Sequence, residues 1–176
     1  MDRRLVSTTN GGLGILIDFS RSGFISLFFK ILMQTYTNTN RSIGVRIALG
    51  SGHLISFWSV HLDYKSFGPY AANNKMVTSL DQILTGENPK EGAGEDEYVN
   101  FEANPQMQHW LSKSEMIPVI LAGDFNSPSH IDWTEETIDK HGNWAVEWPA
   151  TKILDNMGFI DSFRAVHPNI SSVPGW

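Results

Sequence analysis

The 176-residue sequence contains no cysteine, and no glutamate precedes Glu87. The first absence excludes disulfides, thiolate metal sites and cysteine nucleophiles. Long apolar runs are also missing: the longest, residues 24–33, is interrupted by Ser26 and Lys30 and is far shorter than the roughly 20 residues that span a bilayer. The amino-terminal segment does not fit a normal signal peptide. We therefore expect no transmembrane segment, and a soluble intracellular protein is favoured.

Charge is sparse and mostly negative. Only 18% of residues are charged and the net charge is -6, so strong nonspecific attraction to nucleic acid is not expected without a local basic patch. The 41% of hydrophobic residues suits a globular protein. This length favours a single domain with a real core, and we expect a monomer.

From Ile43 onward, the hydrophobic pattern predicts strands alternating with helices. Alternating or continuous apolar runs predict strands over residues 43–49, 54–62 and 118–122. Helical spacing predicts helices that begin at Pro69, Pro105 and Pro149. The first of these should end at Gly86 and the third at Gly158. This order predicts an α/β domain.

Two stretches do not follow this pattern. Residues 1–42 give no clean period beyond a strand entry near Gly14, so they stay unassigned and the domain is placed at 43–176. Residues 87–96 are rich in glycine and acidic side chains, which predicts an exposed loop.

The segment Gly123-Asp124-Phe125-Asn126 carries the strongest chemical signal. Side chains two residues apart on an extended chain point the same way, so Asp124 and Asn126 would face one pocket. One could activate or orient a water molecule while the other donates to a phosphoryl oxygen. The alternative is an Asx turn in which both side chains only bind backbone amides.

His61 ends another apolar strand, in Val60-His61-Leu62-Asp63. Neighbouring strand ends converge in such sheets, so a titratable ring would lie where a proton donor or phosphate contact is useful. A lone histidine is more often structural than catalytic. Together with Asp124 and Asn126, however, His61 predicts a phosphoester site.

Three segments resemble the endonuclease/exonuclease/phosphatase superfamily. They are Ser59-Val60-His61-Leu62-Asp63-Tyr64 followed by Gly68-Pro69-Tyr70-Ala71-Ala72, then Gly123-Asp124-Phe125-Asn126-Ser127-Pro128-Ser129-His130, and then Asp161-Ser162-Phe163-Arg164. The resemblance runs from about Ile43 to Trp176. It implies a two-layered β-sandwich flanked by helices, as in deoxyribonuclease I, and hydrolysis of phosphoesters with Mg²⁺ or Mn²⁺. The substrate stays open, with nucleic acid among the candidates.

The resemblance also implies roles for individual residues. His61 would contact the scissile phosphate and assist proton transfer. Asp124 would orient and deprotonate the attacking water or hold the metal, and Asn126 would steady the same water, a phosphoryl oxygen or the metal. Phosphoryl transfer needs charge stabilisation and positioning more than covalent help, which agrees with this division.

Weaker candidates surround these three residues. Arg164 could clamp a phosphate, but a structural salt bridge within Asp161-x-x-Arg164 is favoured. His130 could bind substrate, but a loop ring packed on the core is commoner. The acidic stretch 132–136 is most simply a solvated helix start, and Trp144 and Trp148 are expected in the core or a lid.

The family pattern includes elements that this sequence lacks. They are an asparagine and a metal-binding glutamate near the amino end and a Ser-Asp-His element near the carboxyl end. We therefore expect an incomplete domain, truncated at both ends, with little activity of its own. Two alternatives stay open: a noncatalytic remnant that acts by binding, and a carbohydrate-binding β-domain suggested by the six tryptophans.

Overall fold

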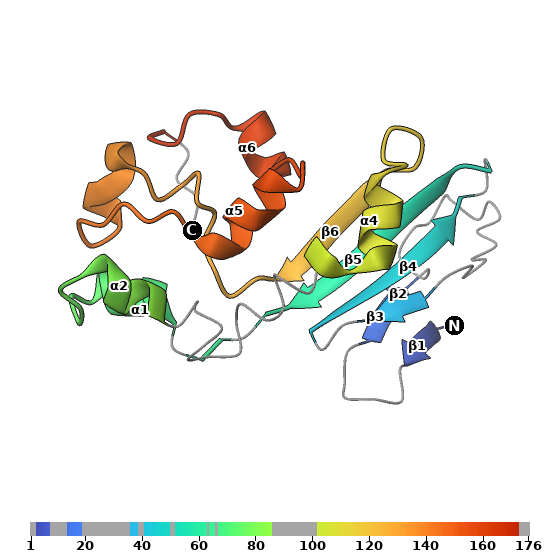
Figure 1. The fold of residues 1–176 in the computed structure, drawn as a ribbon, viewed down its shortest axis with the longest axis horizontal. Coiled ribbons are helices and arrows are strands. Elements are labelled where there is room, and N and C mark those ends of the chain that lie inside the picture. Colours follow the sequence, from blue (N-terminus) through green and yellow to red (C-terminus); the bar gives the residue numbers. More distant parts are fainter. Residues whose placement is uncertain are drawn as a thin grey trace. The chain divides into compact units, whose positions relative to one another are not determined.

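The computed structural model describes residues 3–7, 14–18, 36–38, 41–49, 52–62, 64–65, 67–85 and 102–172. The chain divides into two compact units (Figure 1). Unit 1 comprises Met1–His61 and Ala103–Asp124, and unit 2 comprises Leu62–Glu102 and Phe125–Trp176. The described residues form strands, among them a mixed sheet, together with several helices, so the α/β class is confirmed. The acidic loop expected at 87–96 lies outside the described residues.

Unit 1 contains a four-stranded mixed sheet with the order β3-β4-β5-β6. Its strands are β3 (Tyr36–Asn38), β4 (Ser42–Ala48), β5 (Leu54–His61) and β6 (Val119–Asp124). β4 is antiparallel to both β3 and β5, whereas β5 is parallel to β6. Two further strands, β1 (Arg3–Ser7) and β2 (Gly14–Asp18), form an antiparallel pair in the segment left unassigned from the sequence. The three strands predicted beyond Ile43 are confirmed.

Helix α4 (Pro105–Leu111) packs on the central strand of this sheet. Trp58 from β5 and Trp110 from α4 are fully buried, and their rings meet edge to face with centroids 5.6 Å apart. α4 begins as predicted, because the Asn104 side chain accepts hydrogen bonds from the amides of Gln106 and Met107. Apolar residues with β-strand and helical spacing therefore meet in one core.

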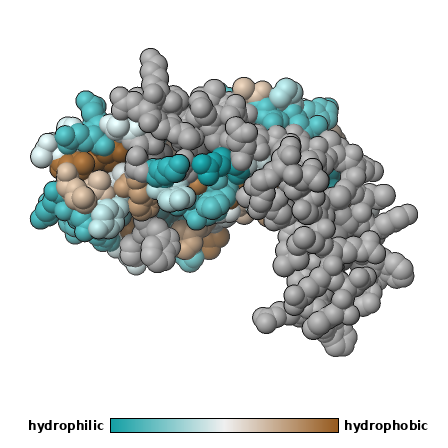
Figure 2. Space-filling view, turned by 90° about the horizontal axis from the view of Figure 1, so that it is seen from below, coloured by the Kyte–Doolittle hydropathy of each residue, from teal (hydrophilic) through white to brown (hydrophobic). Residues whose placement is uncertain are grey.

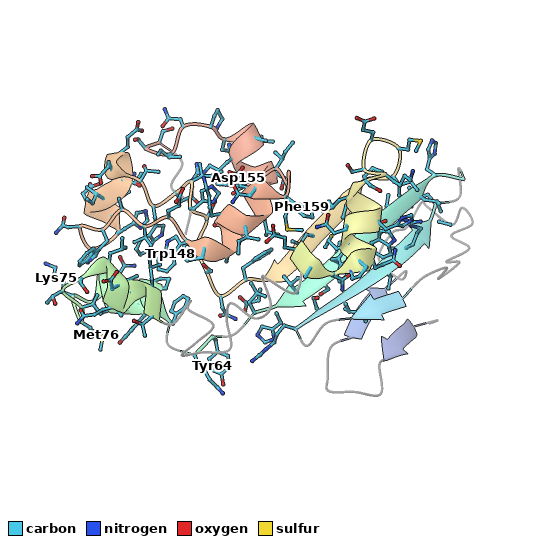
Figure 3. All side chains as sticks on the ribbon, in the orientation of Figure 1. Tyr64, Lys75, Met76, Trp148, Asp155 and Phe159 are labelled. Carbon is cyan, nitrogen blue, oxygen red and sulfur yellow. The ribbon has the colours of Figure 1, made fainter. Side chains whose placement is uncertain are left out.

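Unit 2 is built from short helices around a tryptophan core. The helices are α1 (Gly68–Asn73), α2 (Leu80–Leu84), the 3₁₀ helix η2 (Glu135–Lys140), α5 (Pro149–Asn156) and α6 (Ser162–Val166). Their core contains Ala72, Ile83, Trp133, Val146 and Trp148. Trp133 and Trp148 pack edge to face at 5.0 Å, and Figure 3 shows Trp148 within the body of this unit. The expected core position of Trp148 is confirmed.

The single helix predicted between Pro69 and Gly86 is wrong. α1 ends at Asn73, Lys75 adopts a left-handed φ of 56°, and α2 begins only after its cap Ser79. A left-handed residue cannot continue a right-handed helix, so the chain turns there. As a consequence Met76 is 67% exposed rather than part of an inward apolar face.

Several large apolar side chains of unit 2 lie at the surface. Tyr64 and Met76 point outward from the body of the unit in Figure 3. Figure 2 shows hydrophobic residues interspersed with hydrophilic ones on the face that it presents. Within the described residues, no helix combines the length and apolarity that crossing a membrane requires.

Candidate functional site

His61 and Asp124 lie side by side at the carboxyl ends of β5 and β6. The two strands are parallel and these residues are register partners, so their backbones are about 5 Å apart. Register partners in a sheet direct their side chains to the same face. Both residues are exposed. Of the three residues predicted to converge on one cleft, His61 and Asp124 therefore lie together, so an imidazole and a carboxylate share one solvent-accessible strand edge.

The strand that carries Asp124 differs from the prediction in two ways. β6 continues to Asp124, so Gly123 and Asp124 belong to the strand rather than to the turn after it. In addition, none of its residues is buried, and Ile120 is 43% exposed, although the sequence suggested a buried strand. β6 pairs only with β5 among the described strands, and an outermost strand has fewer neighbours to cover it.

Gly123 permits the close pairing that brings Asp124 beside His61. Its φ of 146° is a conformation that side-chain-bearing residues rarely adopt. A Cβ atom at this position would lie 2.0 Å from the carbonyl oxygen of Val60. The glycine of the Gly-Asp-Phe-Asn segment is thus required by the backbone geometry immediately before Asp124 and His61.

Asn126, two residues beyond Asp124, belongs to unit 2. It adopts a left-handed φ of 47°, and its side-chain nitrogen donates a 2.9 Å hydrogen bond to the carbonyl oxygen of Leu62. The bond joins the residues that follow β5 and β6. This bond fits neither sequence interpretation fully, because the sequence allowed either a side chain facing the pocket or a local Asx turn. The carboxamide instead binds a main-chain carbonyl that is distant in the sequence.

The residues after Asn126 are fastened to helix α5. The backbone nitrogen of His130 donates to Thr151 Oγ1 at 2.9 Å, and the His130 ring nitrogen Nδ1 lies 3.1 Å from the same hydroxyl. Nε2 of this ring lies 3.7 Å from the carboxylate of Asp155 on α5. His130 therefore contacts the helix, in agreement with the structural alternative for this ring. Thr151 gave no signal in the sequence.

Arg164 forms a buried ion pair, but its partner is Asp132 rather than Asp161. The side chains of Arg164 and Asp132 are only 4% and 7% exposed. Asp161 instead caps α6, because its carboxylate accepts from the backbone nitrogen of Arg164 at 3.0 Å. The expectation that Asp132 is solvated is wrong, whereas Glu135 and Glu136 are exposed at the start of η2. A guanidinium with so little exposure is poorly placed to bind a substrate phosphate.

His141 is a buried titratable group that the sequence did not indicate. Its ring stacks on Trp133 with centroids 4.3 Å apart and an interplanar angle of 15°. Burial lowers the pKa of His141, and this effect outweighs the hydrogen bond to the Asp132 backbone and the nearby carboxylates, which act in the opposite direction. The ring consequently favours its neutral form in the folded protein.

The described residues do not complete a metal site. No group of three or more histidine or acidic side chains is close enough to bind one ion within this part of the chain. Mg²⁺ prefers an octahedron of oxygen ligands and commonly uses one or two carboxylates with several waters. Asp124 supplies one carboxylate and Asn126 one carboxamide, so a Mg²⁺ or Mn²⁺ ion would need ligands beyond these two.

A shallow groove in unit 2 contains none of the predicted residues. It has a volume of about 900 Å³ and is lined by residues just before η2, at the start of η2 and after α6, among them Ile131, Glu135, Glu136 and Pro168. Both glutamates are exposed.

The sequence has a relative in Caenorhabditis elegans. That protein, named "Uncharacterized protein F14F9.5", is 50% identical over 145 residues, which cover 82% of this chain and 45% of the relative. The chain thus spans less than half of the length of the relative it matches. No family model and no solved structure matches the sequence.

Proposed function

We propose that this chain carries the central part of the catalytic site of a phosphoester hydrolase of the endonuclease/exonuclease/phosphatase superfamily, with the deoxyribonuclease I-like sandwich as its fold. The observation that supports the proposal best is the pairing of His61 with Asp124 at the ends of two parallel strands. A resemblance in sequence had assigned these two residues to the same reacting phosphate. Their adjacency supplies the geometry that such a role requires.

The chemistry of the pair suits hydrolysis by water. A carboxylate at Asp124 can orient a water molecule and accept its proton, while the neighbouring His61 ring can donate a hydrogen bond to a phosphoryl oxygen or a proton to the leaving group. The resemblance assigns Asn126 to the same water or phosphoryl oxygen, and within unit 2 its side-chain nitrogen donates to Leu62. A divalent cation, when bound, would neutralise phosphoryl charge.

The burial of the tryptophans argues against the carbohydrate-binding alternative. Sugar-binding surfaces need exposed aromatic faces, yet Trp58, Trp110, Trp133 and Trp148 are all at most 2% exposed. These four of the six tryptophans build cores instead. The noncatalytic remnant stays a second candidate, because the described residues supply no complete metal site.

A comparison of two proteins tests the hydrolase. The first is the 176-residue chain, and the second is a hybrid in which this chain replaces the matching part of the longer C. elegans relative. With bis-p-nitrophenyl phosphate as the substrate, we expect slow hydrolysis by the chain and Mg²⁺-dependent or Mn²⁺-dependent hydrolysis by the hybrid. Equal metal-dependent rates would show that the chain needs no further elements. The absence of hydrolysis in both would favour the remnant.

Substitution of Asp124 by asparagine then tests the central residue. Asp124→Asn keeps the size of the side chain and removes its charge, so a general base or metal ligand would lose at least about 10²-fold in rate. The matched control is Asp81→Asn at the exposed start of α2. The melting curves of the hybrid, of its Asp124→Asn variant and of its Asp81→Asn variant should match. Near-full activity of a folded Asp124→Asn hybrid would remove the carboxylate from the proposed mechanism.

A further inference from the structure

We propose that Asp132 and Arg164 are positioning residues that hold the Asn126 loop, defined as residues 126–132, on helix α6 and thereby fix the backbone of Asn126. The inference rests on the proposed function only in giving Asn126 a part in hydrolysis. The mechanical claim, that this ion pair holds the loop, is independent of any activity.

The ion pair is a deeply buried contact between the loop and α6. Besides its contact with Asp132, the guanidinium of Arg164 donates from Nη1 to the carbonyl oxygen of His167 at 3.0 Å. The backbone of Asp132 is bonded as well: its nitrogen donates to the Ser129 carbonyl at 3.0 Å, and its carbonyl accepts from the Thr137 hydroxyl. Asp132 therefore joins the loop, η2 and α6.

A second contact fastens the same loop to the same helix. The hydroxyl of Ser129 donates to Asp161 Oδ2 at 3.0 Å, while Asp161 Oδ1 accepts from the Arg164 nitrogen. The cap of α6 and the ion pair thus share one helical turn. The loop is held at both Ser129 and Asp132, which restricts the path of the backbone between them and Asn126.

Asn126 needs such restriction because of its conformation. Its φ of 47° lies in the left-handed region, which asparagine tolerates better than most residues but which still costs energy relative to ordinary backbone angles. The hydrogen bond from its side chain to Leu62 depends on that conformation. A loop that is free to move would release Asn126 to ordinary backbone angles and misplace its carboxamide.

Because the pair is buried, single and double substitutions can distinguish a role in positioning the loop from a general contribution to stability. When one partner of a buried ion pair is removed, the other is left as an uncompensated charge, whereas replacing both with apolar residues is often nearly neutral. We therefore compare Arg164→Met with the double variant Asp132→Leu and Arg164→Met. The control is Lys140→Met, which removes an exposed hydrogen bond from Lys140 Nζ to the carbonyl oxygen of Ser171 at 2.9 Å.

Amide hydrogen exchange of the 176-residue chain gives the first measurement. In Arg164→Met, peptides covering residues 126–132 should exchange on the order of 10²-fold faster, and in the double variant they should return to within about threefold of the unaltered chain. The control should leave these peptides unchanged. Unchanged exchange in Arg164→Met, or a double variant that exchanges as fast as the single one, would overturn the proposal. If Arg164→Met does not fold, the double variant alone decides: exchange within about threefold of the unaltered chain supports the proposal, and faster exchange overturns it.

Kinetics of the hybrid give the second measurement. A positioning role predicts that Arg164→Met lowers kcat on the order of 10²-fold with little change in KM and that the double variant recovers most of it. A phosphate-binding role predicts no recovery, because the double variant also lacks the guanidinium, and this result would contradict positioning. An inactive hybrid would count against the proposed function alone, since the exchange result does not depend on activity.

Discussion

Substitution of Gly123 by alanine should damage the sheet at the point where His61 and Asp124 meet. The added Cβ would lie 2.0 Å from the Val60 carbonyl oxygen and 2.8 Å from the Val60 nitrogen, and real Cβ atoms essentially never approach within 3.0 Å. The neighbouring backbone of β5 must therefore move by roughly 1 Å. Such a shift takes ladder hydrogen bonds beyond their normal length.

The magnitude follows from two contributions. The φ of 146° costs alanine about 1 to 3 kcal/mol. The loss of one or two ladder hydrogen bonds adds about 1 kcal/mol for each. We expect Gly123→Ala to lower the free energy of unfolding by about 3 to 5 kcal/mol, a large part of the total stability of a domain.

Gly52→Ala is the matched control. Gly52 lies in the same unit and has a φ of 81°, but no atom lies within 4 Å of the position its Cβ would take. Only backbone strain applies there, so its cost should be about 1 to 2 kcal/mol. Urea denaturation followed by tryptophan fluorescence measures both variants. If Gly123→Ala lowered the free energy of unfolding no more than Gly52→Ala does, the close contact with Val60 would not contribute to the effect.

Two further predictions concern His141 and Asn104. Burial lowers the pKa of His141 below its ordinary 6.5, so the unfolded chain binds the proton more readily than the folded chain. The contribution of His141 to stability is therefore full above pH 6.5. It falls as the pH drops through that value toward the pKa of the folded state. Chemical denaturation at several values between about pH 5 and 8 should therefore show that the free energy of unfolding falls toward acid pH, and that this fall is smaller in His141→Phe. The same pH dependence in both proteins would contradict the prediction. Asn104→Ala removes the acceptor for two amides at the start of α4 and should cost about 1 kcal/mol, whereas Ser112→Ala at the other end of the helix should cost less; equal costs would argue against the cap.

Local patterns predicted the elements whose structure is decided locally. β4 and β5 carry alternating or continuous apolar residues, and α4 begins with Asn-Pro, so pattern and outcome agree. The break between α1 and α2 was missed because Met76, Leu80 and Ile83 have helical spacing even though Lys75 turns the chain. Spacing records which residues could share a helical face and does not exclude a left-handed residue between them.

The candidate site was predictable to a similar extent. The adjacency of His61 and Asp124 was predicted because parallel strand ends meet at one edge of a sheet, which is a general property of such sheets. The partner of Arg164 was not found, since Asp132 lies 32 residues away and Asp161 is the obvious neighbour in sequence. Contacts between distant residues depend on the tertiary fold, and no local pattern contains them.

The alternation of the chain between its two units has a consequence for synthesis. β4 and β5 are adjacent in sequence and can pair as soon as they emerge from the ribosome, but β6 joins β5 only after residues 62–102 have been made. The partner of those residues in unit 2, Phe125–Trp176, comes later still. Nonlocal pairing of this kind slows folding and leaves apolar segments exposed during translation. No single cut in the chain would release either unit whole: unit 1 is complete only after the first segment of unit 2 has been made, and unit 2 only after both segments of unit 1.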